Sequence, residues 1–146
     1  MALPEFNVQG DLPPGIHPAS LMDVVQRFGR LSAVRVRSAA RLTHIHDLAQ
    51  RTGHLQRFIV FGSYVTDKVD PNDVDVILVM DDDFYLEQCP TEARALFDHP
   101  TAQARYGASI FWVRPGLLIR ETVDEFIAYW QTKRDGSQRG IVEIIQ

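Results

Sequence analysis

Apolar residues recur along residues 30–51 at the spacing of one helix face, and this pattern predicts a long helix there. The residues on that face are Leu31, Val34, Leu42, Ile45 and Ala49. A shorter helix is predicted over residues 21–28, because Ser20 stands where an N-cap is needed. Gly29 separates the two helices, and Gly53 ends the second.

Continuous apolar runs follow, and they predict strands. Residues 56–61 and 73–80 are short, rich in Val, Ile and Phe, and bounded by turn-forming residues. The other predicted elements are helices over residues 87–97, with a restart at Pro90, and 120–132, and strands over residues 106–114 and 140–145. This mixture of elements favours the α/β fold class, with a small mixed β-sheet flanked by helices.

The start of the chain is less regular than the remainder. Residues 1–18 are rich in Pro and Gly and show no period, so we expect an extended N-terminal arm. Residues 19–146 contain no repeat, low-complexity tract or convincing domain boundary. A chain of 146 residues has room for one domain with a substantial core, and we expect residues 19–146 to form it.

The predicted strand over residues 73–80 is apolar on both faces beyond its first turn. Side chains alternate along a strand, so Asp73 and Asp75 point the same way, about 6.7 Å apart along the backbone. Ile77 and Val79 continue that face. The other face carries Val74, Val76, Leu78 and Met80. This pattern predicts a central, buried strand with two carboxylates, the acid pair Asp73 and Asp75, at its mouth.

A Gly62-Ser63 turn ends the preceding strand, nine residues before the acid pair. Gly62 has no Cβ, so its backbone can approach a ligand closely, and Ser63 adds a hydroxyl beside N–H groups suited to an anion. The two carboxylates repel each other and lose hydration, and a divalent cation relieves both costs. Because Mg²⁺ combines one or two carboxylates with phosphate oxygens and water, the pattern predicts a site for a metal-bound triphosphate.

Each half of this pattern also has a simpler interpretation. Gly-Ser after a strand is a common turn, and Asp-x-Asp at the start of a strand is often a solvated edge. The combination of strand, Gly-Ser, spacer, Asp-x-Asp and strand is more specific than either half, and it favours a functional site.

The combination resembles the signature of the DNA polymerase β-type nucleotidyltransferase superfamily. That signature is an apolar strand, Gly-Ser or Gly-Gly, a spacer of about ten residues, and an acidic-apolar-acidic strand. The resemblance covers residues 58–80 and is closest to the small single-domain members, the minimal nucleotidyltransferases. The segments LPPGIH and GIVEII are also similar to those of a group of bacterial proteins of this fold.

The resemblance implies a nucleotidyltransferase fold with Mg²⁺ or Mn²⁺ as cofactor. The resemblance implies that the nucleotide is bound by Gly62, Ser63 and Lys68. It implies that catalysis and metal binding depend on Asp73 and Asp75. Gly62 and Ser63 would hold the phosphates, and Lys68, in the spacer, is the lysine expected to neutralise phosphate charge.

Two positions depart from the signature. Asn72 stands where many members have Ser, and it retains a hydrogen-bonding side chain. Active members also bring a third carboxylate from a later strand, whereas the candidate strand ASIFWV has Ser109 or Ala108 at the expected place. The nearest acids in sequence are Asp98 and Glu121, and one of them would have to reach the acid pair to replace it.

The implied activity is metal-dependent binding of an NTP and transfer of its nucleoside monophosphate to an acceptor hydroxyl or phosphate. The chain has little room for an acceptor-binding domain, so we expect the acceptor to be a protein or RNA, or to be shaped by a homo-oligomer or hetero-complex. The alternative is a catalytically degenerate protein that senses nucleotides or binds a partner, as in toxin–antitoxin pairs of this superfamily. A plain interaction module, with an incidental Asp-x-Asp, is the third interpretation.

Charge changes this picture only locally, since the net charge is −4 and indicates no general affinity for nucleic acid. Residues 24–57 carry seven arginines and one acid, whereas acids dominate residues 67–83. Arg37 and Arg41 lie one turn apart on a predicted helix face, where they can meet a triphosphate, RNA or an acidic partner. A solvated helix face is the simpler interpretation.

The remaining features concern aromatic residues and location. Phe111-Trp112 and Tyr129-Trp130 are expected in the core, with base stacking by a Trp near the metal site as the alternative.

The single cysteine, Cys89, cannot form an internal disulfide, which fits a reducing cytoplasm. No apolar run approaches membrane-spanning length and the N-terminus does not resemble a signal peptide, so we expect a cytoplasmic protein with no membrane partner.

Overall fold

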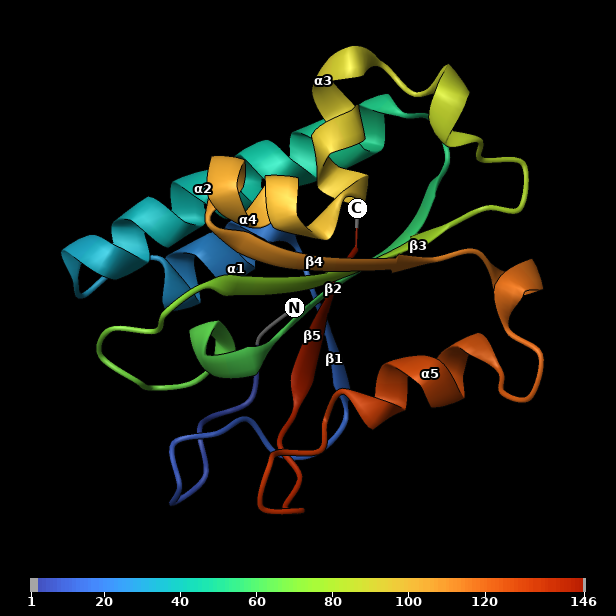
Figure 1. Cartoon of the computed structure of the whole chain (residues 1–146). Coiled ribbons are helices and arrows are strands. Elements are labelled where there is room, and N and C mark those ends of the chain that lie inside the picture. Colours follow the sequence, from blue (N-terminus) through green and yellow to red (C-terminus); the bar gives the residue numbers. More distant parts are fainter. Residues whose placement is uncertain (1–2, 146) are drawn as a thin grey trace.

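The computed structural model describes residues 3–145 and contains one five-stranded mixed β-sheet (Figure 1). The strands are β1 (Ile16–Ala19), β2 (Leu55–Phe61), β3 (Val74–Met80), β4 (Ala108–Val113) and β5 (Ile141–Ile144), in the order β1-β5-β2-β3-β4. Strand β2 is antiparallel to both β3 and β5, whereas β1–β5 and β3–β4 are parallel pairs. The predicted fold class, a small mixed sheet flanked by helices, is therefore confirmed.

Helices cover both faces of the sheet unequally (Figure 1). The helices are α1 (Leu21–Phe28), α2 (Ala33–Arg51), α3 (Thr91–Arg94), α4 (His99–Tyr106) and α5 (Val123–Tyr129). Helices α1 to α4 lie on one face, and α5 alone lies on the other. Within residues 3–145, no helix combines the length and the apolarity needed to cross a membrane.

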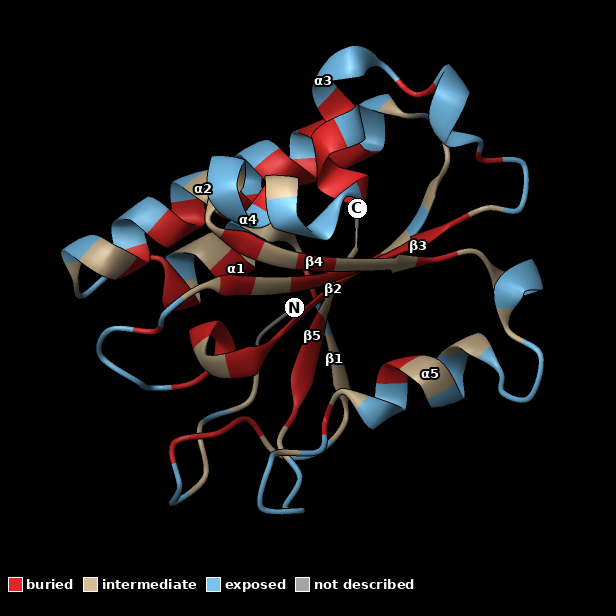
Figure 2. Cartoon of the chain, viewed as in Figure 1, coloured by how far each residue is buried: buried red, intermediate tan, exposed pale blue. Residues whose placement is uncertain are grey.

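Two apolar clusters, one on each face of the sheet, form the core (Figure 2). Val74, Val76, Leu78 and Met80 of β3 belong to the cluster under α1 to α4. Ile77 and Val79 belong to the smaller cluster under α5. The predicted division of β3 into two apolar faces is confirmed, and β3 lies between β2 and β4 as a buried inner strand.

Local signals place the helix ends. Ser20 accepts a hydrogen bond from the backbone N–H of Asp23 at 3.0 Å, and Asp23 completes a capping box at the start of α1. Ser32 caps α2, which begins three residues later than predicted. Thr122 forms a second capping box at the start of α5, so that helix is shorter than the predicted span of 120–132.

The region between β3 and β4 differs from the prediction. We expected a helix over residues 87–97 with a restart at Pro90. The structure divides this span at Pro90 into the short turn η2 (Leu86–Gln88) and, after the proline, α3 followed by the short turn η3 (Ala95–Phe97). Helix α4 was not predicted, although its ends carry ordinary signals. Asp98 caps its first turn, and Gly107 ends it with φ of +61°.

The N-terminal segment is joined to the sheet. Residues 16–19 form β1, which pairs with β5, so the expected boundary between residues 18 and 19 falls inside a strand. Leu12 and Ala19 are buried in the cluster under α1 to α4. The segment expected to be an extended arm therefore contributes to the core.

Candidate active site

Asp75 lies at the centre of the candidate site, on the face of the sheet that α5 covers. In the sheet register it stands opposite Phe61 of β2 and beside Ser109 of β4. Its carboxylate packs against the backbone of Gly62, at the start of the short 3₁₀ turn η1 (Gly62–Val65). A Cβ at Gly62 would collide with that carboxylate, and Gly62 has a φ of +79°, which favours glycine. The structure thus brings the Gly-Ser turn and the acid strand together.

Asp73 immediately precedes β3 and is partly exposed. Its Oδ2 accepts a long hydrogen bond, 3.4 Å, from Nε2 of Gln103 on α4. Burial and the negative charge of Asp73 together raise the pKa of the Asp75 carboxyl group to about 6, and Arg139 opposes the shift. The charge of Asp73 therefore acts on Asp75, whereas the hydrogen-bond partner of Asp73 belongs to α4, on the other face of the sheet.

A pocket of about 330 Å³ opens in front of Asp75. The lining residues are Phe61, Gly62, Asp75, Ser109, Phe111, Trp130, Thr132, Lys133, Arg134 and Arg139. Sequence reasoning missed the cationic members of this set, which come from the loop between α5 and β5. Three basic residues within seven positions were visible, but no local pattern indicated that the loop folds back beside β3.

Ser63 and Lys68 occupy different surroundings. Ser63 is half-buried in η1, and its carbonyl accepts hydrogen bonds from the backbone N–H and the hydroxyl of Thr66 at 3.3 and 2.7 Å. Lys68 is exposed and lines another cavity, together with Leu31 and Val69, and it is not among the residues that line the pocket of Asp75. The fold places the predicted Ser63 next to Gly62 and the predicted Lys68 away from the pocket.

The resemblance predicted a third carboxylate on a later strand, and β4 carries none. Ser109 stands beside Asp75, and Ala108 stands beside Val74. Asp98 caps α4 by accepting a hydrogen bond from the backbone N–H of Thr101 at 3.2 Å. Within the described range 3–145, no three His, Cys, Asp or Glu side chains gather in a group that could hold a metal ion.

The two tryptophans lie on opposite faces of the sheet. Trp112 packs edge-on against Phe84 and Phe97 beneath the helices. Trp130 packs against Phe61 and Phe111, with ring centroids 4.9 and 4.7 Å apart, and it lines the pocket of Asp75. Trp130 is therefore the tryptophan placed beside the candidate site.

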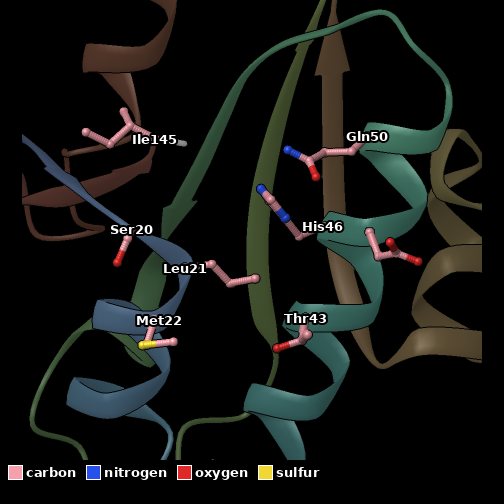
Figure 3. A pocket seen from close by; sticks show the side chains of 8 residues that line it. Ser20, Leu21, Met22, Thr43, His46, Gln50 and Ile145 are labelled. Atoms are coloured by element: carbon pink, nitrogen blue, oxygen red, sulfur yellow. The ribbon is translucent and has the colours of Figure 1, made fainter.

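A second cavity, of about 360 Å³, lies on the other face, between the start of α1 and the middle of α2. Figure 3 shows Thr43, His46 and Gln50 projecting from α2 toward Ser20, Leu21 and Met22. His46 is buried edge-on against Phe58, and burial lowers its pKa, which favours the neutral imidazole. The lining of this second cavity includes one acid, Asp47, which is paired with Arg51, so the cavity lacks an acid pair.

Comparison with known proteins places the chain in a family. A family model matches residues 4–145. The chain belongs to that family, described as a family of unknown function (DUF6932). No curated protein and no solved structure matches the chain. Since the family description carries no activity, function has to be argued from the site.

Proposed function

We propose that this protein binds a nucleoside triphosphate together with Mg²⁺ or Mn²⁺ in the pocket of Asp75, and that it transfers the nucleoside monophosphate to an acceptor hydroxyl or phosphate. One observation carries the proposal: the half-buried Asp75 carboxylate lies against the Gly62 turn, near Asp73, and faces a pocket lined by cations. This combines acidic, backbone and cationic groups in one small pocket.

The residues present fit a divalent cation. Asp73 and Asp75 would hold it, because Mg²⁺ takes one or two protein carboxylates and completes its coordination with water and phosphate oxygens. The raised pKa of Asp75 shows the cost of a half-buried carboxylate beside another acid, and a cation offsets that cost. When bound, the ion would supply neutralisation of phosphate charge.

The protein's own groups would bind and orient the nucleotide. The backbone of Gly62 lies beside Asp75, and the N–H groups of the turn at Gly62 and Ser63 would bind phosphate oxygens there. Trp130 offers an aromatic surface in the same pocket. Because Lys68 lines another cavity, phosphate neutralisation is assigned to the cations of the loop before β5.

A second candidate is a catalytically degenerate protein that senses nucleotides or binds a partner protein, in the manner of a toxin–antitoxin pair. Ser109 beside Asp75 favours it, because β4 supplies no third carboxylate to bind metal and activate an attacking hydroxyl. Losing a metal ligand and a base together costs several kcal/mol of barrier, hence orders of magnitude in rate.

In both cases we propose that the protein acts in the cytoplasm and that its acceptor or partner is a protein or RNA. We also propose that it works in a homo-oligomer or hetero-complex.

Calorimetric titration with ATP and GTP, with and without Mg²⁺, tests nucleotide binding. Wild type should bind in a Mg²⁺-dependent manner, and Asp75→Asn should bind at least about tenfold more weakly. Asp83→Asn removes an exposed acid after β3 and should leave the affinity unchanged. Absence of nucleotide binding by the folded wild type contradicts the proposal. Release of pyrophosphate in the presence of an acceptor then separates the transferase from the degenerate protein, which binds without turnover.

A further inference from the structure

The loop before β5, residues 131–139, is a short hairpin that presents cations to the pocket of Asp75. Thr132 and Gln138 form an antiparallel bridge, and the N–H of Arg139 donates to the carbonyl of Gln131 at 2.9 Å. In such a hairpin, residues two apart on one strand and their cross-strand neighbours share a face. Lys133 and Arg139 therefore lie on one face, and both line the pocket.

One buried carboxylate holds both cations. The Nζ of Lys133 donates to Oδ2 of Asp11 at 2.8 Å, and Nη1 of Arg139 lies 3.9 Å from Oδ1 of the same group. The side chain of Asp11 is 7% exposed, whereas Lys133 and Arg139 are 27% and 24% exposed. Asp11 is thus closed to solvent, while both cations remain accessible from the pocket.

Asp11 belongs to a strap, residues 7–15, that joins the two walls of the pocket. On one side, the N–H of Asp67, just beyond η1, donates to the carbonyl of Gly10 at 2.9 Å. On the other side, the N–H of Gly140 donates to the carbonyl of Leu12 at 2.9 Å. The strap therefore fixes the hairpin relative to the Gly62 turn, and Asp11 sets the direction of its cations.

The charge balance leaves this corner open to an anion. Arg134 adds a third cation to the lining, so three positive side chains face two carboxylates, Asp11 and Asp75. Asp135, in the same hairpin, accepts hydrogen bonds from Ser137 and does not line the pocket. An ammonium has three donors and a guanidinium has five, so contact with Asp11 leaves donors for phosphate oxygens.

We propose that Lys133 and Arg139 form a phosphate-binding subsite for the pyrophosphate part of a nucleotide, and that Asp11 is the residue that positions them. The assignment of this subsite to a nucleotide rests on the proposed function. Its ligand chemistry is that of two linked phosphates, which a nucleoside triphosphate and free pyrophosphate share. Arg139 lies 3.9 Å from Asp11 and lines the same pocket as Asp75, which places the subsite beside that carboxylate.

Titration with inorganic pyrophosphate, ATP and AMP, in the absence of divalent metal, tests the subsite. Wild type should bind pyrophosphate and ATP at least about tenfold more tightly than AMP, since AMP lacks the linked phosphates. Lys133→Ala and Arg139→Ala should each weaken pyrophosphate binding about tenfold or more. Arg120→Ala removes an exposed arginine before α5 and serves as the matched control, with unchanged affinity. Equal affinities in all four proteins overturn the subsite.

Two substitutions test the positioning role of Asp11. Asp11→Asn keeps an acceptor for the Nζ of Lys133, so it should retain most of the pyrophosphate affinity. Asp11→Ala removes the acceptor and should weaken binding about tenfold. Affinity is measured on protein shown to be folded by circular dichroism. Tighter binding by both variants would show that Asp11 competes with the ligand, and unchanged affinity in both would show a purely structural role. Either result overturns the positioning role.

Failure of the subsite and failure of the nucleotide site give different results. Mg²⁺-dependent ATP binding that is lost in Asp75→Asn but unaffected by Lys133→Ala and Arg139→Ala overturns the subsite alone. Pyrophosphate binding that depends on Lys133 and Arg139, without any Mg²⁺-dependent nucleotide binding, overturns the nucleotide site and keeps the anion subsite. Absence of pyrophosphate and nucleotide binding overturns both.

Discussion

At Asp75, burial and the nearby charge of Asp73 raise the pKa of the carboxyl group to about 6, from an ordinary value of 3.8. The folded protein therefore holds this proton more tightly than the unfolded chain. Its contribution to stability is fully present below pH 3.8 and is lost as the pH rises through about 6. A carboxylate kept at a cost to stability is typical of a functional site.

Asp75→Asn should consequently stabilise the folded protein at neutral pH. The shift corresponds to at most about 3 kcal/mol, so the variant should gain about 1–3 kcal/mol in free energy of unfolding at pH 7.5. At pH 3.5 both side chains are neutral and the difference should vanish. Urea unfolding at the two pH values measures this, with Asp83→Asn as an exposed control. A gain of equal size at both pH values contradicts the electrostatic cause.

Gly62 offers a second test at the residue scale. Gly62 and Gly53 have nearly the same φ, +79° and +76°, but a Cβ at Gly53 meets nothing within 4 Å. Gly53→Ala should cost about 1 kcal/mol of stability from backbone strain alone. Gly62→Ala should cost about 1–3 kcal/mol more, because its Cβ displaces the Asp75 carboxylate. Chemical denaturation of both variants measures the difference.

The double variant Gly62→Ala with Asp75→Ala supplies the control for this prediction. Removing the carboxylate should abolish most of the excess cost of Gly62→Ala, because the two side chains no longer overlap. Additive effects of the two substitutions would show that the clash lies elsewhere.

Among the secondary-structure elements, α2 organises the loop that joins the Gly-Ser turn to the acid pair. Arg35 of α2 is 4% exposed, and its guanidinium donates to the carbonyls of Phe28, Tyr64, Thr66 and Lys68 at 2.6–3.0 Å. Buried carbonyl groups need partners, and this stretch lacks a regular ladder. One arginine of α2 therefore stabilises the entry to the site.

Arg35→Met should destabilise the protein by about 2–4 kcal/mol, since it leaves several buried carbonyls without their donors. Arg37→Met, two residues further along the same helix at an exposed position, should change stability by less than about 0.5 kcal/mol. Thermal and urea unfolding of both variants provide the comparison. Similar losses in the two would mean that the hydrogen bonds of Arg35 carry little net stability.

Secondary structure was predicted correctly where a long apolar run or helical period extended over many residues. It was missed where a short element depended on several weak local signals. The strands β2 and β3 and the long helix α2 follow from continuous apolar runs or a helical face. Helix α4 was missed because Ala102 is the one buried residue among its eight, so the helix has no clear apolar face. Its Asp98 cap and Gly107 end were visible but are common in turns as well.

At the scale of the whole molecule, the candidate site is assembled from three distant parts of the chain. The strap of residues 7–15, the turn and acid strand of residues 62–75, and the hairpin of residues 131–139 meet at one end of the sheet. The ion pair between Asp11 and Lys133 joins residues 122 positions apart. The N-terminal segment, which was expected to be an arm outside the domain, links the other two parts through its backbone hydrogen bonds.

The sequence by itself determined the local half of the site. Alternation of side chains predicted that Asp75 shares a face with Ile77 and Val79, and a glycine was expected where the backbone is closely approached. Asp73, predicted on the same face, lies just before β3, and its carboxylate accepts a hydrogen bond from Gln103 of α4. Both inferences depend on geometry within a few residues. The chain also showed that the strand ASIFWV carries no acid.

Only the tertiary structure decided the other half. The register that sets Ser109 beside Asp75, the hairpin that brings Lys133 and Arg139 to the pocket, and the buried Asp11 that holds them all depend on long-range pairing. A strand shifted by one residue would exchange its faces, and the turn residues of a loop do not indicate which surface it covers. Contacts between distant segments are set by the packing of the whole chain, which local periodicity does not encode.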